Sequence, residues 1–206
     1  MIITDVQPRR HRFSQLFIDG EAAVKIDTET WLRSGLMPGD EIDDERLHQL
    51  LQDSAAHRAH EKALYLLEHR AHSKKELADK IARAEFDREA ARAAADRMEE
   101  LGLIDDEQYA YRLAQELFTR KKFGVRRVRQ ELQQKGIADE IIAVVLEELS
   151  PEEGETVEKI REIVERKYPM AREDEKVRRR AVAALQRYGY KLEDIFSVLS
   201  EERFEE

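Results

Sequence analysis

Cysteine is absent from this chain of 206 residues. Without thiols the protein has no disulfides, no thiolate zinc site and no cysteine nucleophile, which suits a reducing compartment. Long apolar runs are absent too. No segment approaches the roughly 20 apolar residues that cross a bilayer, and the first 13 residues lack the apolar stretch of a signal peptide. We therefore expect a soluble cytoplasmic protein that does not enter a membrane.

Residue patterns typical of catalysis and of phosphate loops are also missing. The eight glycines stand at expected turns and helix ends, not in the spacing of a nucleotide-binding loop. His57, His60 and Glu61 lie about one helical turn apart, but no further ligand accompanies them, so a polar helix face is expected there. Asp105 and Asp106 are better explained by a helix N-terminus than by paired catalytic carboxylates. We expect no enzymatic activity, no metal and no cofactor.

One apolar pattern occurs three times along the chain. The three copies are separated by 51 and then 53 positions, and the same offsets continue into the following segment. The matching residues are Leu77, Ile81 and Phe86, then Val128, Leu132 and Ile137, then Ala181, Leu185 and Tyr190. Such a period indicates one small structural unit that is used repeatedly.

The repeat predicts an all-α fold with three tandem three-helix repeats, at residues 57–103, 104–150 and 151–206. Units of about 45 residues are near the lower limit of independent folding. They should therefore stack as solenoid repeats do, which predicts an elongated, curved module. Residues 1–56 differ and form a small N-terminal β-hairpin plus helix extension.

The extension carries a hairpin signal. Apolar residues at 13–18 and 23–26 flank Asp19-Gly20, a dipeptide favoured in two-residue hairpin turns. Because an isolated hairpin is barely stable in water, it should pair with residues 2–6 or pack on a helix.

Helix boundaries follow from capping residues and breakers. Ser73 with Glu76 forms a capping box. The segment 150–155, which contains Pro and Gly in an acidic run, is predicted to be a linker. The other expected N-caps are Thr28, Asp43 or Asp44, Asp87, and Asp105 or Asp106, and a further helix is expected to start at Asp139.

Positive charge is concentrated at one place in each repeat, although the chain has 36 Lys and Arg against 45 Asp and Glu. The connection between the first and second helices and the start of the second helix are basic every time. We call these candidate binding residues the basic ridge: Arg70, Lys74, Lys75, Arg120, Lys121, Lys122, Arg126, Arg127, Arg129, Lys176, Arg178 and Arg179. Such a ridge attracts phosphate or an acidic protein surface.

The junctions between repeats are acidic instead. These residues are Glu99, Glu100, Asp105, Asp106, Glu147, Glu148, Glu152 and Glu153, then Glu201, Glu202, Glu205 and Glu206. The alternative explanation for all these charges is an ordinary solvated helix surface, since pairs such as Glu76–Lys80 need no partner.

Three phrases of the sequence are specific in combination: Tyr65, Leu66, Leu67, Arg70, Ser73, Glu76, Leu77 and Lys80, then 101–106 with Tyr109 and Ala110, then Lys122, Gly124, Glu131, Leu132, Lys135, Gly136 and Ile137. Together they resemble the RecX family, bacterial modulators of the RecA recombinase. The resemblance covers residues 57–200, and residues 1–56 are similar to the extra segment of longer members.

The resemblance implies three tandem three-helix units without catalytic residues. It implies binding along the RecA–DNA filament, in its groove, with reduced ATP hydrolysis, strand exchange and coprotease activity by RecA. It also implies a place in recombination, DNA repair and the SOS response. Whether the basic ridge faces single- or double-stranded DNA or a protein surface stays open. The acidic surface favours a monomer.

Two other functions stay open. The chain could bind DNA directly and non-specifically through the basic ridge, with a steep salt dependence. Residues 139–149 do not suit a recognition helix, because a helix that reads the major groove needs exposed polar side chains, whereas Ile141, Ile142, Val144, Val145 and Leu146 are apolar. An inert helical scaffold is the third possibility.

Overall fold

The computed structural model describes residues 1–84 and 86–200. These residues form ten helices and three strands, which confirms a mostly helical fold with a small N-terminal β element. The chain divides into two compact units, residues 1–104 and the part that begins at Asp105, and each is described by itself. Glu201, Glu202, Glu205 and Glu206 of the predicted acidic ends lie outside the described residues.

The N-terminal sheet has three antiparallel strands in the order of the chain: β1 (Ile3–Arg9), β2 (Phe13–Ile18) and β3 (Glu21–Asp27). Asp19 and Gly20 both have positive φ, at 50° and 86°, as a tight hairpin turn between twisted strands requires. The predicted hairpin is confirmed, and it gains β1 as a third strand.

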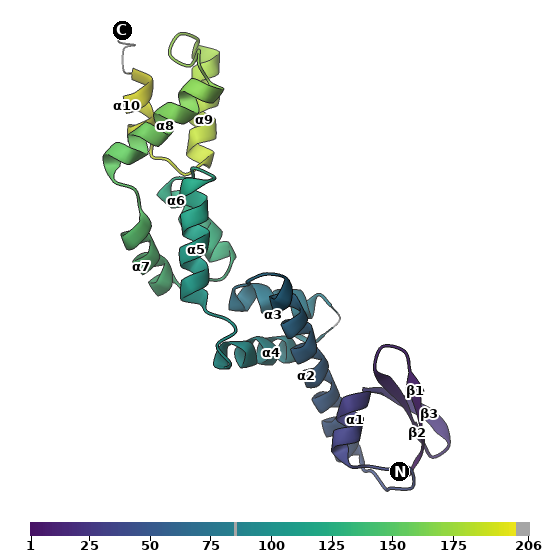
Figure 1. The fold of residues 1–206 in the computed structure, drawn as a ribbon. Helices are drawn as coiled ribbons and strands as arrows, with labels where there is room; N and C mark the ends of the chain where they lie inside the picture. The colour runs from purple at the N-terminus through teal and green to yellow at the C-terminus, as the bar shows by residue number, and fades with distance from the viewer. Residues whose placement is uncertain (85, 201–206) are drawn as a thin grey trace. The chain divides into compact units, whose positions relative to one another are not determined.

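The sheet packs on two helices, α1 (Thr28–Ser34) and the first half of α2 (Asp44–His69) (Figure 1). Trp31 and Leu50 from these helices are buried with apolar side chains of the sheet. The prediction that Thr28 caps this helix is wrong. Asp27 caps α1, because its side chain accepts a hydrogen bond from the N–H of Thr30 at 3.0 Å.

The first repeat contains the second half of α2, then α3 (Lys74–Ala82) and α4 (Arg88–Glu100). Helix α2 runs without a break from the extension into the repeat. The hydroxyl of Ser73 accepts from the N–H of Glu76 at 3.2 Å, and Asp87 caps α4 in the same way at 2.7 Å. Both predicted caps are therefore confirmed.

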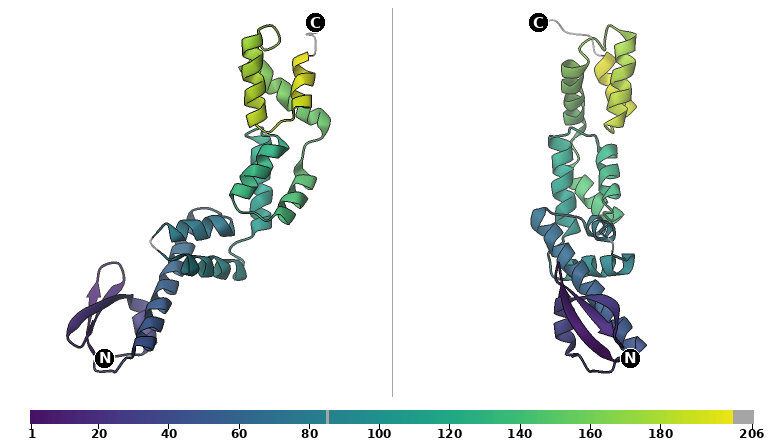
Figure 2. Two further views of the ribbon diagram at one scale, coloured as in Figure 1. Left: turned by 180° about the vertical axis from the view of Figure 1, so that it is seen from behind. Right: turned by 90° about the vertical axis from the view of Figure 1, so that its right-hand side faces the viewer.

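The second unit contains two further groups of three helices, which gather as separate bundles in Figure 2. Their helices are α5 (Asp106–Thr119), α6 (Val125–Gln134), α7 (Asp139–Leu149), α8 (Glu153–Lys167), α9 (Glu175–Arg187) and α10 (Leu192–Ser200). Equivalent positions of the three repeats have equal burial: Leu77, Val128 and Ala181 are all 0% exposed. The repeated apolar pattern is therefore the core of each three-helix unit.

The predicted linker at 150–155 is shorter than expected. Helix α8 begins at Glu153, so Gly154 lies within its first turn. Glu153 and Glu155 in this turn favour the helix because they lie near its positive end, which outweighs the glycine. No helix in the described part of the chain is long and apolar enough to cross a membrane.

Candidate nucleic-acid interface

Two basic ridge residues of the first repeat are engaged within the repeat. The guanidinium of Arg70 donates to the carboxylate of Glu76 at 2.9 and 3.1 Å. The ammonium of Lys74 lies 2.7 Å from carboxylate oxygens of both Asp96 and Glu99 on α4. Hydrogen bonds to these two carboxylates raise the pKa of Lys74, so its ammonium group stays protonated. The negative charges of the two carboxylates offset its positive charge.

Lys75 is different, since it is exposed and has no ion-pair partner among the described residues. Close to it in the chain, the His72 side chain is only 1% exposed, and its Nδ1 lies 3.2 Å from Glu76. Burial lowers the pKa of His72 below its ordinary 6.5, and the hydrogen bond to Glu76 only partly opposes this. His72 therefore adds no positive charge near neutral pH, and Lys75 is the one basic ridge residue of this repeat without an ion-pair partner among the described residues.

The second repeat presents the largest set of unengaged cations. Lys121, Arg126 and Arg129 are exposed, and the described part of the chain offers none of them an ion-pair partner. Arg126 and Arg129 lie three residues apart on α6, so they share one face of that helix. Arg120 is also exposed, but its guanidinium lies 3.0 Å from Glu116.

The start of α6 is unusual in its charge. Every other helix of the described residues has an acid in its first turn, but α6 has none and instead begins Val125-Arg126-Arg127. Its N-cap is Gly124, which offers no side-chain acceptor, whereas Ser73 and Asp174 cap the equivalent helices. Positive side chains at the positive end of a helix are unfavourable for the helix alone. The arginine side chains themselves attract anions.

Two further basic residues of the second repeat are engaged in the structure, one with the third repeat and one within its own helix. Lys122 forms an ion pair with Glu162 of α8, and its carbonyl accepts a hydrogen bond from the hydroxyl of Tyr190 at 2.7 Å. Arg127 forms an ion pair with Glu131, and its guanidinium lies 5.7 Å from the ring centroid of Phe123. These contacts fix the turn that carries Lys121 and Arg126.

The same turn packs against the turn that follows α9. The N–H of Gly124 donates to the carbonyl of Tyr188 at 2.7 Å, and the ring centroids of Phe123 and Tyr188 lie 5.6 Å apart. A Cβ atom on Gly124 would lie 2.6 Å from the carbonyl oxygen of Gly189. The second and third repeats are therefore joined through backbone contact at two glycines.

The third repeat places its ridge residues at the far end of α9 from this joint. Lys176 and Arg178 have no ion-pair partner within the described ranges, whereas Arg179 donates to Glu175 at 2.9 Å. At 1.5 Å per residue, Lys176 lies about 18 Å along α9 from Tyr188. Within this unit the basic ridge therefore consists of two clusters separated by the length of a helix.

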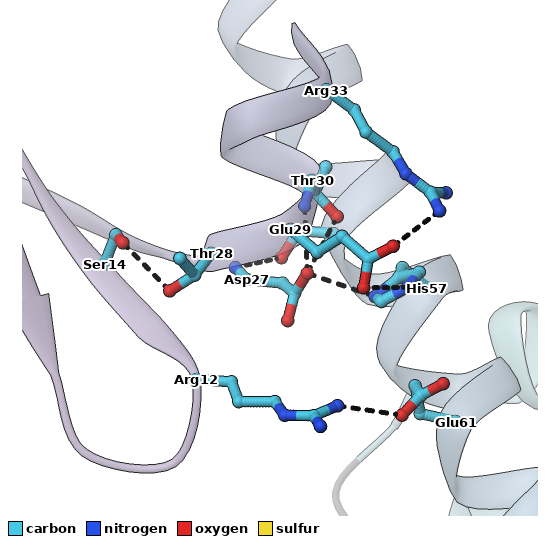
Figure 3. Close-up of polar contacts among 10 residues, drawn as sticks. Arg12, Ser14, Asp27, Thr28, Glu29, Thr30, Arg33, His57 and Glu61 are labelled. Atoms are coloured by element: carbon cyan, nitrogen blue, oxygen red, sulfur yellow. Dashed lines mark hydrogen bonds and ion pairs between the residues drawn. The ribbon is translucent and has the colours of Figure 1, made fainter.

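Figure 3 shows how the N-terminal extension is attached to α2. The N–H of Asp27 donates to the hydroxyl of Ser54 at 2.8 Å, and Arg12 pairs with Glu61 at 3.2 Å. His57, predicted to lie on a polar helix face, is only 19% exposed, and its Nδ1 lies 3.1 Å from Asp27. The described residues contain no group of three side chains suited to a metal. His57 instead contacts the extension.

Sequence reasoning missed the partners of the turn in the second repeat. Tyr188, Tyr190 and Glu162 carry no recognisable motif, and they lie 40 to 68 positions from Lys122. The available signal was the recurrence of glycine at 136 and 189. It indicated the ends of helices, but not a contact between the second and third repeats.

Three segments of the chain match sequence descriptions of known three-helix domains. Residues 59–98 match the first three-helix domain of RecX, residues 105–146 the second and residues 153–199 the third. The regulatory protein RecX of Caldanaerobacter subterraneus subsp. tengcongensis is 34% identical over 201 residues, covering 97% of this chain and 99% of that protein. The chain belongs to the RecX family. The resemblance expected from the sequence is thereby confirmed.

Other RecX proteins match over shorter stretches. The one of Trichlorobacter lovleyi is 37% identical over 63% of this chain and 85% of its own length. The chain spans only 56% of a 30% identical RecX from Lactobacillus delbrueckii subsp. bulgaricus. These relatives are named regulatory proteins, so the family is one of regulators.

Solved RecX structures share the fold. A crystal structure of a regulatory protein RecX aligns with a TM-score of 0.67 at 18% identity, over 97% of this chain and 99% of that one. The crystal structure of RecX from Lactobacillus salivarius aligns with a TM-score of 0.58 at 20% identity, over 71% and 95% of the two chains.

Proposed function

We propose that this chain is a non-enzymatic regulator that binds RecA–DNA nucleoprotein filaments and reduces the ATPase, strand exchange and coprotease activities of RecA. Membership of a family of regulators supports this. The observation that carries the contact itself is the exposed trio of Lys121 in the turn before α6 and Arg126 and Arg129 on that helix, none of which has an ion-pair partner among the described residues. We propose that it acts as a cytoplasmic monomer.

The basic ridge divides into residues for contact and residues for support. Six members have no ion pair among the described residues and are proposed to contact phosphate or acidic side chains of the filament: Lys75, Lys121, Arg126, Arg129, Lys176 and Arg178. The other six are engaged with neighbouring carboxylates: Arg70, Lys74, Arg120, Lys122, Arg127 and Arg179. We propose that most of these hold the contact residues in place.

Repetition provides the affinity in this proposal. Each repeat contributes only one to three unpaired cations, and a single such contact is weak in physiological salt. Linking several contacts in one chain raises the effective concentration at each of them. The division into residues 1–56, 57–103, 104–150 and 151–206 belongs to the same proposal, with one contact cluster for each repeat.

Direct binding to naked DNA is the second candidate, and the same unpaired cations favour it. It would be insensitive to base sequence, because the exposed face of α7 carries apolar side chains and carboxylates, which DNA phosphates repel, and no Arg, Lys, Asn or Gln to read base edges. Val144 on its outer face is 55% exposed and Ile141 is half-buried. Both candidates use phosphate contacts, so only the dependence on RecA separates them.

The test is the ATPase of RecA on single-stranded DNA, measured with the full chain below one copy per RecA. We expect inhibition at substoichiometric protein, together with weak binding to duplex DNA when RecA is absent. No inhibition by protein whose circular dichroism shows folded helices contradicts the proposal. Equal affinity for naked duplex and for filament favours the second candidate.

A further inference from the structure

A groove of ≈ 560 Å³ lies between α5 and α7 of the second repeat, and no basic ridge residue lines it. On α7, the lining residues Ile141, Val144, Val145 and Glu148 are spaced as i, i+3, i+4 and i+7, so this wall is a single stripe of that helix. The groove is lined by Asp105, Glu107, Gln108, Tyr111 and Arg112 on the first wall and by Glu140, Ile141, Val144, Val145 and Glu148 on the second.

The floor of this groove exposes large apolar side chains. Val144 is 55% exposed and Tyr111 is 39% exposed, although the core of the repeat is formed by other residues of the same two helices. The positions equivalent to Val144 in the first and third repeats are Ala93 and Ser197. A large exposed apolar side chain at this position is thus not a requirement of the repeat fold, and only the second repeat carries one there, although α10 exposes Leu192 and Phe196 at other positions.

The rim of the groove is negative. Four carboxylates, Asp105, Glu107, Glu140 and Glu148, surround the apolar floor, and Arg112 is the one cation among the lining residues. Asp105 also caps α5 by accepting from the N–H of Gln108 at 2.8 Å. A rim of this sign repels nucleic acid and acidic peptides, and it favours apolar side chains that are flanked by Lys or Arg.

We propose that this groove binds a basic amphipathic helix of a protein partner. Two walls of helix side chains accept a third helix that lays its apolar face between them, with anchors one turn apart. Leu or Met anchors would cover Ile141 and Val144, while cations on the flanks face Glu140 and Glu148. This binding surface is separate from the basic ridge and opposite in charge, and it does not require RecA binding to be correct.

The probe is a synthetic helical peptide of 18 residues with a Leu stripe at i, i+3 and i+7 and with Lys and Arg elsewhere. Its binding to the full chain is measured by fluorescence anisotropy, beside a peptide with the same Leu stripe and Glu in place of the cations, and a peptide of scrambled order. We expect binding of the basic helix only.

Two variants of the groove, one single and one double, separate its apolar and charged contributions. Val144→Asp should weaken binding at least tenfold, and the pair Glu140→Lys with Glu148→Lys should abolish it. Ala93→Asp, the same change at the equivalent exposed position of the first repeat, should leave the affinity unchanged. Because all four positions are exposed, the fold should tolerate each change, and circular dichroism checks this.

The proposal is overturned if the basic helix binds no better than its scrambled form, or if Val144→Asp and Ala93→Asp have equal effects. It is also overturned if the full chain dimerises in analytical ultracentrifugation and Val144→Asp abolishes the dimer, because the occupant is then a second copy.

Discussion

Gly124 and Gly189 touch each other through their backbones and thereby join the second repeat to the third. A Cβ atom on Gly189 would lie 2.3 Å from the backbone nitrogen of Arg127, and Gly189 has a φ of 91°. Side chains are excluded at both positions, at Gly189 by conformation as well as by space. The turn that positions Arg126 and Lys121 is therefore held by a contact that tolerates no other residue type.

Gly189→Ala should lower the free energy of unfolding of the second unit by about 2–5 kcal/mol, since it adds backbone strain to overpacking. Urea unfolding followed by circular dichroism measures this. Gly102→Ala is the matched control for conformation, because Gly102 has a φ of 69° but a Cβ atom there would meet nothing within 4 Å; it should cost about 1 kcal/mol. Equal losses for the two variants would show that the close contact is unimportant.

Tyr190 should ionise unusually late. Burial raises the pKa of its phenol to about 12, and nearby Glu162 adds to this. The raised pKa means that the stability due to the neutral hydroxyl is complete below about pH 10 and is lost as the pH rises through 12. In an ultraviolet titration of the tyrosine phenols, Tyr190→Phe should have one phenol fewer among those that ionise near pH 12. This variant should also lose about 1 kcal/mol at neutral pH, with the hydrogen bond to Lys122. A titration identical to that of the wild type would contradict the assignment.

His72 should make the first repeat sensitive to acid. Its pKa is lowered by burial, so the folded protein binds the proton less readily than the unfolded chain does. Its contribution to stability is therefore complete above about pH 6.5 and declines as the pH falls below that value. The substitution His72→Gln should flatten the dependence of urea midpoints on pH between about 7 and 5. An unchanged slope in this variant would show that another group is responsible.

Ser54 should hold the N-terminal sheet on α2. Its hydroxyl accepts the buried N–H of Asp27 at 2.8 Å, and Ser54→Ala leaves that N–H without an acceptor. The expected loss is about 1–3 kcal/mol. Trp31 is the only tryptophan of the chain and is buried in this region, so its fluorescence reports the loss. Gln52→Ala, on the exposed side of α2, should leave the transition unchanged, and a similar shift in both variants would argue against the hydrogen bond.

The periodic features of the fold were predictable from the sequence, because local rules determine them. The apolar positions of the repeat, the caps at Ser73 and Asp87 and the hairpin at Asp19-Gly20 are all correct. The third strand was predicted only as one of two ways to stabilise the hairpin. β1 and β2 also form a local hairpin through residues 10–12, but His11 and Arg12 adopt the positive φ there, at 61° and 62°, and these residue types give no turn signal in the sequence.

The candidate site was predictable as a set of cations, but not as a set of exposed ones. Lys74 on α3 is paired with Asp96 and Glu99, which lie on α4. Helical spacing along α3 alone therefore does not reveal these partners. Likewise, the engagement of Lys122 by Glu162 follows from packing of the second repeat on the third. Only the folded chain separates Arg126 and Arg129 from basic neighbours that are already neutralised.

The most direct test of the account compares filament binding by two triple variants across a salt titration. Lys121→Gln with Arg126→Gln and Arg129→Gln should weaken binding to RecA on single-stranded DNA. It should reduce the slope of log K against log salt by roughly 2 units, at about 0.7 per neutralised phosphate contact. The matched variant replaces three exposed arginines at the end of α3 and on α4, outside the basic ridge, by Gln: Arg83, Arg88 and Arg92. Its slope should equal that of the wild type. Equal slopes for the wild type and both variants, or equal losses in both, would contradict the account.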